Sequence, residues 1–96
     1  MDQKYIVHED GNRFYIGDYN HMIGEITYFE NKEGQLVVDH TYVNPEYRGQ
    51  NLGMILLNAM VNHAEKVNKM IIPLCPYVEK VFSRSKDYDH IWFKKA

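Results

Sequence analysis

The sequence predicts a single α/β domain of the α+β type, in which an antiparallel meander of strands leads into a βαβ unit and a second short helix. Bursts of Tyr, Ile, Val, Phe and Thr, separated by turn-forming residues, are typical of antiparallel strands and occupy the first half of the chain. Apolar residues then recur at helical spacing, and the short apolar run after them indicates a buried strand parallel to its predecessor. The 96 residues leave room for one hydrophobic core, so we expect one domain spanning residues 1–96.

The composition argues against several classes of protein. Hydrophobic residues make up 45% of the chain, which is enough for a packed core rather than a disordered segment. A net charge of -2, without a long block of one sign, argues against nucleic-acid binding. No apolar run reaches the roughly 20 residues that a membrane span needs. Because Cys75 is the only cysteine and the N-terminus does not resemble a secretory signal, we expect a cytoplasmic protein.

Four strands are expected before the long helix. Their predicted ranges are Lys4–Val7, Arg13–Tyr19, Ile23–Glu30 and Leu36–Val43. Turn-forming residues separate them, most clearly Gly11 and Gly34. The fourth strand is expected to end at Asn44-Pro45, because proline has no backbone N–H to donate to a neighbouring strand.

The remaining elements are two helices with a strand between them. The long helix is predicted from Asn51 to Val67, and the strand Met70–Leu74 then completes a right-handed βαβ unit. The apolar stripe of the long helix consists of Leu52, Ile55, Leu56, Ala59, Met60, His63 and Val67. A shorter helix is expected after Pro76. Its apolar face carries Val78, Val81, Phe82 and Ser85. The tail Tyr88–Phe93 is expected to pack back on the core.

The junction between the fourth strand and the long helix is the clearest candidate for an anion site. The first N–H groups of a helix have no intrahelical acceptor, and the helix dipole adds partial positive charge there. Gly49 and Gly53 allow a ligand to approach the backbone, and Arg48 adds a full positive charge with forked geometry. The alternative is a plain strand-to-helix loop in which Asn51 is the N-cap of the helix and Gly53 is an incidental weak helix former.

This junction also carries a resemblance to a known family. The string Arg48-Gly49-Gln50-Asn51-Leu52-Gly53 resembles the Gln/Arg-x-x-Gly-x-Gly/Ala phosphate loop of the GNAT acetyltransferase superfamily, and a Val-x-Pro-x-x-Arg lead-in precedes it. The segments 25–28, 40–43 and 72–78 are similar to successive blocks of a short GNAT-like branch. Asn51 departs from the central glycine of the loop, although Asn tolerates the left-handed conformation better than most residues. The chain also lacks helices and strands that wall the acceptor site in longer members.

The resemblance implies an acetyl-CoA-binding domain with a mixed sheet. Coenzyme A is then expected in a groove between the fourth strand and the strand 70–74, which splay apart. The backbone near Val43 would bond the pantetheine, and the amides of Gln50 to Gly53 would hold the pyrophosphate. The expected cofactor-binding residues are Val43, Arg48, Gly49, Gln50, Asn51, Leu52, Gly53 and Tyr77.

Three side chains are candidates for catalysis. Glu25 is a possible general base, although strand alternation favours solvent for its carboxylate. His40 titrates in a useful range beside the expected groove, and a purely structural histidine is the alternative. Cys75 lies at a helix start that favours a reactive thiolate, where it either accepts the acetyl group or lines the channel; otherwise it is a small buried hydrophobe. Tyr77 is either an acid for the departing thiolate or a packed aromatic.

The sequence leaves the function open between two main hypotheses. One is an N-acetyltransferase that moves acetyl from acetyl-CoA to an unidentified amine of a small molecule or a protein. The other is a non-catalytic acyl-CoA-binding or protein-interaction module, and an unrelated α/β interaction domain is a weaker third. We expect a monomer or weak dimer with no nucleic-acid or membrane partner. No metal is expected, because the histidines show no ligand spacing.

Overall fold

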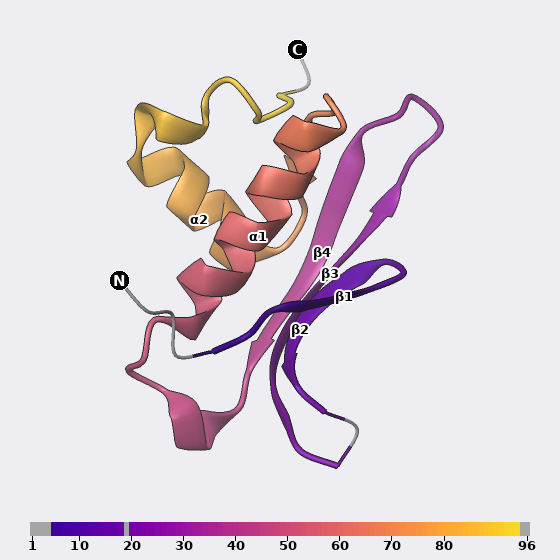
Figure 1. Ribbon diagram of the computed structural model, residues 1–96. Helices are drawn as coiled ribbons and strands as arrows, with labels where there is room; N and C mark the ends of the chain where they lie inside the picture. The colour runs from indigo at the N-terminus through magenta and orange to yellow at the C-terminus, as the bar shows by residue number, and fades with distance from the viewer. Residues whose placement is uncertain (1–4, 19, 95–96) are drawn as a thin grey trace.

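The computed structural model describes residues 5–18 and 20–94, which form one five-stranded sheet with two helices to one side of it in Figure 1. The strands, in sheet order, are β1 (His8–Asp10), β2 (Arg13–Gly17), β3 (Met22–Glu30), β4 (Leu36–Val43) and β5 (Ile71–Pro73). The first four form an antiparallel meander, and β5 joins β4 in parallel. Helix α1 (Leu52–Lys66) links β4 to β5, and α2 (Pro76–Arg84) follows β5. The predicted mixed sheet with a βαβ unit and a second short helix is confirmed.

The first predicted strand is wrong. Strand pairing begins at His8, so residues 5–7 lie outside any strand, and Lys4 lies outside the described residues. The chain turns tightly at Gly11, which has φ of 63°. This turn places Asp10 opposite Arg13, and the pairing of β1 with β2 reaches only as far as His8. The residues of β1 are all exposed and polar or charged, so hydrophobic patterning does not reveal this edge strand.

The other strand boundaries differ from the predictions by a few residues or less. Strand β2 ends at Gly17, whose φ of 111° interrupts the register, and Tyr19 lies outside the described residues. Strand β3 begins one residue earlier than predicted, at Met22, and β4 matches its prediction. Strand β5 is shorter than the predicted run, because its pairing with β4 ends at Pro73.

A bulge in β4 changes which side chains face α1. Tyr28 pairs with Val38, but Thr27 pairs with His40, so Asp39 is an extra residue in β4. Since paired residues share a face of the sheet, Val38 and Thr41 lie on the same face although they are three positions apart. Past the bulge, the side of the sheet that α1 covers therefore receives Thr41 and not His40.

The buried side of α1 is wider than the predicted stripe. Leu52, Leu56 and Met60 are buried as predicted, but Val67 lies beyond the end of the helix and is 39% exposed. The buried residues that the stripe missed are Leu57, Val61 and Ala64. The core cluster includes residues of α2 and the C-terminal tail as well as the sheet. Helix α1 therefore buries more of its circumference than it would against a sheet alone.

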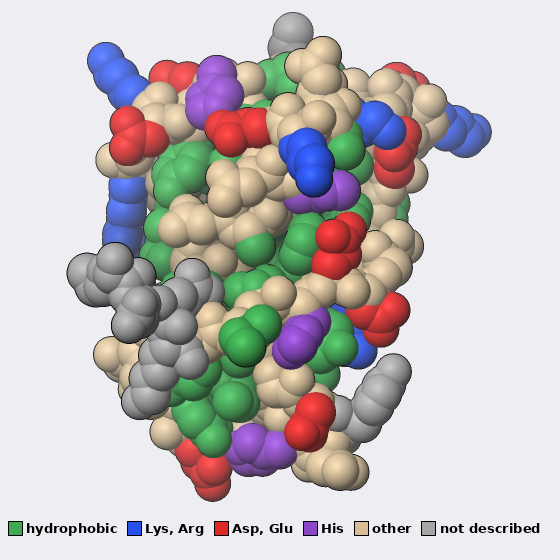
Figure 2. Space-filling model, viewed as in Figure 1, with side chains coloured by type: hydrophobic (Ala, Val, Ile, Leu, Met, Phe, Trp, Pro, Cys, Tyr) green, Lys and Arg blue, Asp and Glu red, His purple; other side chains and the backbone are tan. Residues whose placement is uncertain are grey.

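The C-terminal tail packs back on the core, as predicted. Ile71 donates its N–H to the carbonyl of Ile91, and Phe93 donates to the carbonyl of Ile71, so the tail covers the outer edge of β5. Ile91 is 4% exposed, and the rings of Phe82 and Tyr88 stack with centroids 4.9 Å apart. None of the helices among the described residues is both long enough and apolar enough to cross a membrane. On the face in Figure 2, basic and acidic side chains lie interspersed.

Replacing Leu56 with alanine should lower the free energy of unfolding by roughly 2 to 5 kcal/mol, because it removes buried apolar atoms and leaves a cavity. Leu56 is 0% exposed and reaches the backbone of Gly24, where an added Cβ would lie 3.1 Å from its Cδ1 atom. Chemical denaturation of Leu56→Ala, compared with Asn58→Ala at an exposed position of the same helix, measures this loss. Equal stability of the two variants would contradict the assignment of Leu56 to the core.

Candidate functional site

Strand β4 extends beyond its partner β5 and leaves a free edge. The pairing ends at Val38 and Pro73, and the last bond between the two segments runs from the N–H of Cys75 to the carbonyl of Val38 at 2.9 Å. Farther along β4, Asn44 donates its N–H to Ile23 of β3 at 2.8 Å. Because backbone groups alternate in direction along a strand, the N–H and carbonyl of Val43 point the other way, toward the space that β5 has left.

A run of unpaired backbone donors follows this free edge. The short 3-10 turn η1 (Pro45–Tyr47) ends where Arg48 donates to the carbonyl of Pro45, and the first bond that closes α1 runs from Ile55 to Asn51 at 3.2 Å. Within the described part of the chain, the N–H groups of residues 49–54 have no hydrogen-bond acceptor. Unpaired donors at the start of a 15-residue helix form a site for an anion, reinforced by the helix dipole.

The backbone of this loop is left-handed at two positions. Gly49 has φ of 83°, and Asn51 has φ of 62° and ψ of 28°. Asn51 therefore adopts the conformation expected where the family loop has glycine. Asn51 occupies the N-cap position of α1, as the plain-loop alternative expected, but its side chain makes no capping hydrogen bond. A left-handed residue followed by right-handed helical residues turns successive N–H groups to one side, as in the anion-binding loops called nests.

The remaining loop residues hold this backbone in place. Leu52 is 2% exposed and belongs to the core, so only its backbone N–H is available to a ligand. The side-chain oxygen of Gln50 accepts a hydrogen bond from the hydroxyl of Tyr5, which ties the loop to the N-terminal segment. The side chain of Arg48 is exposed.

A cavity of about 260 Å³ lies where the free edge of β4, the start of α1 and the start of α2 meet. Its lining residues are Thr41, Val43, Arg48, Gly53 and Tyr77. Four of these five were expected from the sequence, and Thr41 was not. Strand alternation predicts that Thr41 and Val43 lie on the same face of the sheet. The sequence did not show that this face borders the cavity.

Tyr77 closes one side of the cavity by lying against Gly53. A Cβ atom on Gly53 would come within 2.8 Å of the Tyr77 hydroxyl oxygen and 3.0 Å of Cζ, so glycine is what allows the ring to approach α1. Partial burial raises the pKa of Tyr77, and the neighbouring Tyr88 and Cys75 raise it further. Its hydroxyl therefore keeps its proton at neutral pH and is available as a hydrogen-bond donor.

Cys75 lies next to the cavity but is itself buried. It is 6% exposed, it occupies the N-cap position of α2, and its thiol donates to the hydroxyl oxygen of Thr41 at 3.5 Å. Thr41 lines the cavity and Cys75 does not, so the thiol is in contact with the cavity through Thr41.

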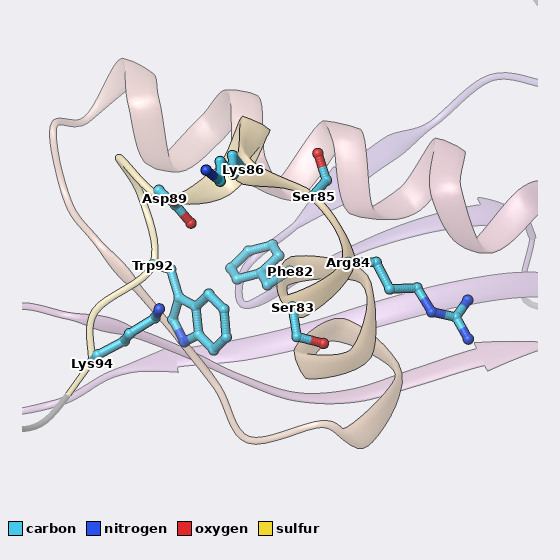
Figure 3. A pocket seen from close by; sticks show the side chains of 8 residues that line it. All are labelled: Phe82, Ser83, Arg84, Ser85, Lys86, Asp89, Trp92 and Lys94. Carbon is cyan, nitrogen blue, oxygen red and sulfur yellow. The ribbon is translucent and has the colours of Figure 1, made fainter.

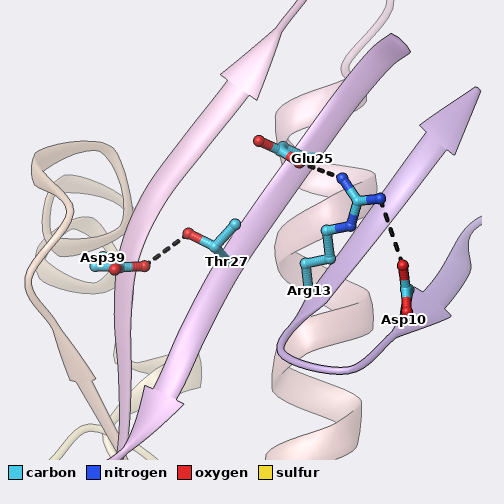
Figure 4. A network of polar contacts seen from close by, with 5 residues as sticks. All are labelled: Asp10, Arg13, Glu25, Thr27 and Asp39. Carbon is cyan, nitrogen blue, oxygen red and sulfur yellow. Dashed lines mark hydrogen bonds and ion pairs between the residues drawn. The ribbon is translucent and has the colours of Figure 1, made fainter. Parts of the chain in front are cut away.

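Glu25 and His40 lie on the other face of the sheet. Glu25 alternates with the buried residues Gly24 and Ile26, and it forms an ion pair with Arg13 at 2.8 Å (Figure 4). His40 pairs with Thr27 on that same face, one position from the bulge. The structure thus places the three predicted catalytic residues on two faces and does not bring Glu25 or His40 together with Cys75.

A larger hollow of about 360 Å³ lies at the other end of α2 (Figure 3). Arg84, Lys86 and Asp89 are among its lining residues, and the ammonium of Lys94 lies 4.2 Å from the ring centre of Trp92. This hollow lies at the C-terminal end of α2 and borders neither the free edge of β4 nor the start of α1. Size alone therefore does not identify the functional site.

Comparison with known proteins decides the family. A sequence model of GCN5-related N-acetyl-transferases matches residues 13–91. The chain belongs to the GCN5-related N-acetyltransferase family. The solution structure of a GCN5-like protein from Staphylococcus aureus is similar, with 33% identity and a TM-score of 0.78 over 95% of this chain and 90% of that one. No functionally curated protein matches the sequence significantly.

A second solved structure shares the fold of this GNAT domain at lower sequence identity. The crystal structure of a ribosomal-protein-alanine N-acetyltransferase from Brucella melitensis biovar Abortus 2308 has 19% identity and a TM-score of 0.57. The match covers 91% of this chain but 66% of that one, so it spans only part of the longer protein. At this level of identity the likeness shows the fold alone. Membership of a family of N-acetyltransferases places the chain among acetyl-transferring enzymes.

The left-handed backbone of Asn51 predicts that glycine is tolerated better than serine at this position. Asn51→Gly should remain within a few tenths of a kcal/mol of the parent, whereas Asn51→Ser should lose about 1 kcal/mol, because serine lacks the tolerance of glycine and asparagine for this conformation. Serine is a good side-chain cap, so a serine variant as stable as the parent in chemical denaturation would show that Asn51 acts as a cap after all.

Proposed function

We propose that this protein is an acetyl-CoA-dependent N-acetyltransferase that acts on an unidentified amine. The observation that carries the proposal is that two sets of free backbone groups reach one cavity: the unpaired donors at the start of α1, through Gly53, and the unpaired edge of β4, through Val43. The first set suits a pyrophosphate, and the second suits the amide groups of a pantetheine arm.

The residues around the cavity fit coenzyme A along its length. The amides of Gln50 to Gly53 would hold the pyrophosphate, with Arg48 adding charge from the surface. The backbone of Val43 would bond the pantetheine, and the thioester would then lie toward Thr41 and the start of α2. Bound acetyl-CoA would supply an activated acyl group, and every other contribution must come from residues of this chain or from the acceptor.

Acetyl transfer needs a neutral amine, stabilisation of charge on the thioester oxygen, and a donor to the departing thiolate. Tyr77 is a candidate donor, because it lines the cavity and a tyrosine hydroxyl carries its proton at neutral pH. A base would have to act on an amine that arrives from the open face of the sheet, where Glu25 and His40 lie. His40 is better suited than Glu25, since Glu25 is paired with Arg13, whereas no residue in the described segments hydrogen-bonds to the His40 ring.

Incubation with acetyl-CoA, a panel of primary amines and a thiol-detecting reagent tests this proposal. Amine-dependent release of coenzyme A supports it. Binding of coenzyme A without release for any amine would favour the acyl-CoA-binding module, which the separation of Glu25 and His40 from the cavity would then explain. Failure to bind coenzyme A in a calorimetric titration would overturn the proposal.

Replacing Gly53 with valine should weaken coenzyme A binding by about tenfold or more, while Arg48→Ala should weaken it only a few-fold. The Cβ of valine would displace Tyr77 into the cavity and obstruct the helix donors. Arg48 is exposed, and solvent screens the contribution of one exposed charge.

Calorimetric titration of the two variants measures this difference. Asn58→Val is the matched control, because it introduces the same β-branched residue into α1 at an exposed position. If Gly53→Val bound coenzyme A as tightly as Asn58→Val, the pyrophosphate would not lie at the start of α1.

Cys75 should be protected from a thiol-alkylating reagent by saturating coenzyme A, because Thr41 connects the thiol with the cavity that the cofactor would fill. The rate of alkylation, followed by intact-mass measurement, tests this. Equal rates with and without coenzyme A would remove Cys75 from the site. Exposure to acetyl-CoA without acceptor distinguishes two routes: acyl transfer through Cys75 predicts an acetylated protein. Direct transfer, which we favour, predicts no adduct.

A further inference from the structure

Thr41 is the side chain that both lines the cavity and contacts Cys75. The bulge at Asp39 places it on the side of the sheet that faces α1, together with Val43. Its hydroxyl oxygen is 3.5 Å from the sulfur of Cys75, which donates the thiol proton to it. Thr41 is partly exposed, whereas Cys75 is buried, so a group entering the cavity meets the hydroxyl before the thiol.

This contact orients the Thr41 hydroxyl. A threonine hydroxyl has one proton to donate and two lone pairs to accept with, and the Cys75 thiol occupies one lone pair. Within the described residues no other hydrogen bond involves this hydroxyl, so its own proton is free to point into the cavity. The β-branched side chain also has few χ1 rotamers, which limits the directions that the proton can take.

We propose that the Thr41 hydroxyl donates a hydrogen bond to the carbonyl oxygen of the bound acyl thioester, and that the Cys75 thiol positions this hydroxyl instead of carrying the acyl group. This inference rests on the proposed function and deepens it. Thr41 is then a catalytic residue that touches the substrate, and Cys75 is a positioning residue. A fixed donor at the oxygen where charge develops stabilises the transition state more than solvent does, because it needs no reorientation during the reaction.

The reaction balances without a proton from Thr41. The lone pair of the acceptor nitrogen forms a bond to the thioester carbon, while negative charge builds on the carbonyl oxygen that faces Thr41. The bond from carbon to sulfur then breaks, and its electron pair leaves with the sulfur of coenzyme A. The extra proton on nitrogen passes to a base or to water, and the departing thiolate takes a proton from a donor such as Tyr77. The Thr41 proton stays on its oxygen throughout.

Paired substitutions at Thr41 and Cys75 test the assignment by steady-state kinetics. Thr41→Val keeps the shape and removes the donor, so kcat should fall by about 100-fold or more while the Kd for coenzyme A changes by less than about threefold. Thr41→Ser should restore most of the loss. Cys75→Ser should be more active than Cys75→Ala, because a serine hydroxyl can donate to Thr41 as the thiol does. Thr27→Val, on the opposite face of the sheet, is the matched control.

A binding measurement provides a readout that does not depend on turnover. Acetyl-CoA has the carbonyl oxygen that Thr41 would contact, and S-ethyl-CoA has a methylene in its place. The parent should bind acetyl-CoA more tightly, and Thr41→Val should abolish that preference. If Thr41→Val does not fold, Cys75→Ala serves instead and should reduce the preference by releasing the hydroxyl.

The outcomes separate the two proposals. An inactive Cys75→Ser variant, or an acetyl adduct on Cys75, would overturn the positioning role in favour of a covalent route. A parent that shows no preference for acetyl-CoA, or a Thr41→Val variant with unchanged kcat and unchanged preference, would overturn the role of Thr41 while leaving N-acetyltransferase activity in place. A parent that binds neither ligand would overturn the proposed function itself.

Discussion

The early end of the pairing between β4 and β5 is the constraint on which the site depends. The N–H of Leu74 turns back to the carbonyl of Ile72 at 3.1 Å, so it does not continue the ladder along β4. Cys75 supplies the last bond to β4, at the carbonyl of Val38, and Pro76 then begins α2, so the chain leaves the sheet. The second half of β4 therefore keeps an unpaired edge.

Two further contacts turn this free edge into a site. Pro76 begins α2 directly after the last bond, so the start of α2 is held beside the gap, and Tyr77 then lies against Gly53 at the start of α1. The cavity is bounded by three elements that share the hydrophobic core, and the backbone hydrogen bond of Cys75 and the contact of Tyr77 with Gly53 lie at its border. Because both helices start at this point, their positive ends face the same small volume.

The bulge in β4 determines which side chains lie on each face of the sheet. On the α1 side it presents Thr41 to the cavity and to Cys75. On the other side it leaves Asp39, which accepts a hydrogen bond from Thr27 at 2.6 Å, beside the ion pair of Arg13 with Glu25 (Figure 4). The two faces of β4 therefore carry different side chains beyond the bulge, with Thr41 on the cavity side and His40 on the open face.

The sequence by itself determined the features that depend on local chemistry. Gly34 and Pro45 bracket β4, the helical spacing of apolar residues reveals α1, and Asn51 tolerates the left-handed turn that precedes α1. The exposed polar strand β1 gave no such signal, because hydrophobic patterning reports burial and β1 buries nothing. The free donors of residues 51–54 were likewise predictable, since every helix start leaves four N–H groups without an intrahelical acceptor.

Only the tertiary structure decided that Thr41 lines the cavity and that His40 does not. A one-residue bulge reverses the facing of every later residue in β4, so His40, which a search for titratable groups selects, lies on the open face, and Thr41 takes the place beside Cys75. Glu25 was predicted as a possible base, but its carboxylate accepts a hydrogen bond from Arg13. Arg13 lies 12 positions earlier in the chain. These outcomes depend on strand register and on contacts between distant segments, which local patterns of residue type do not encode.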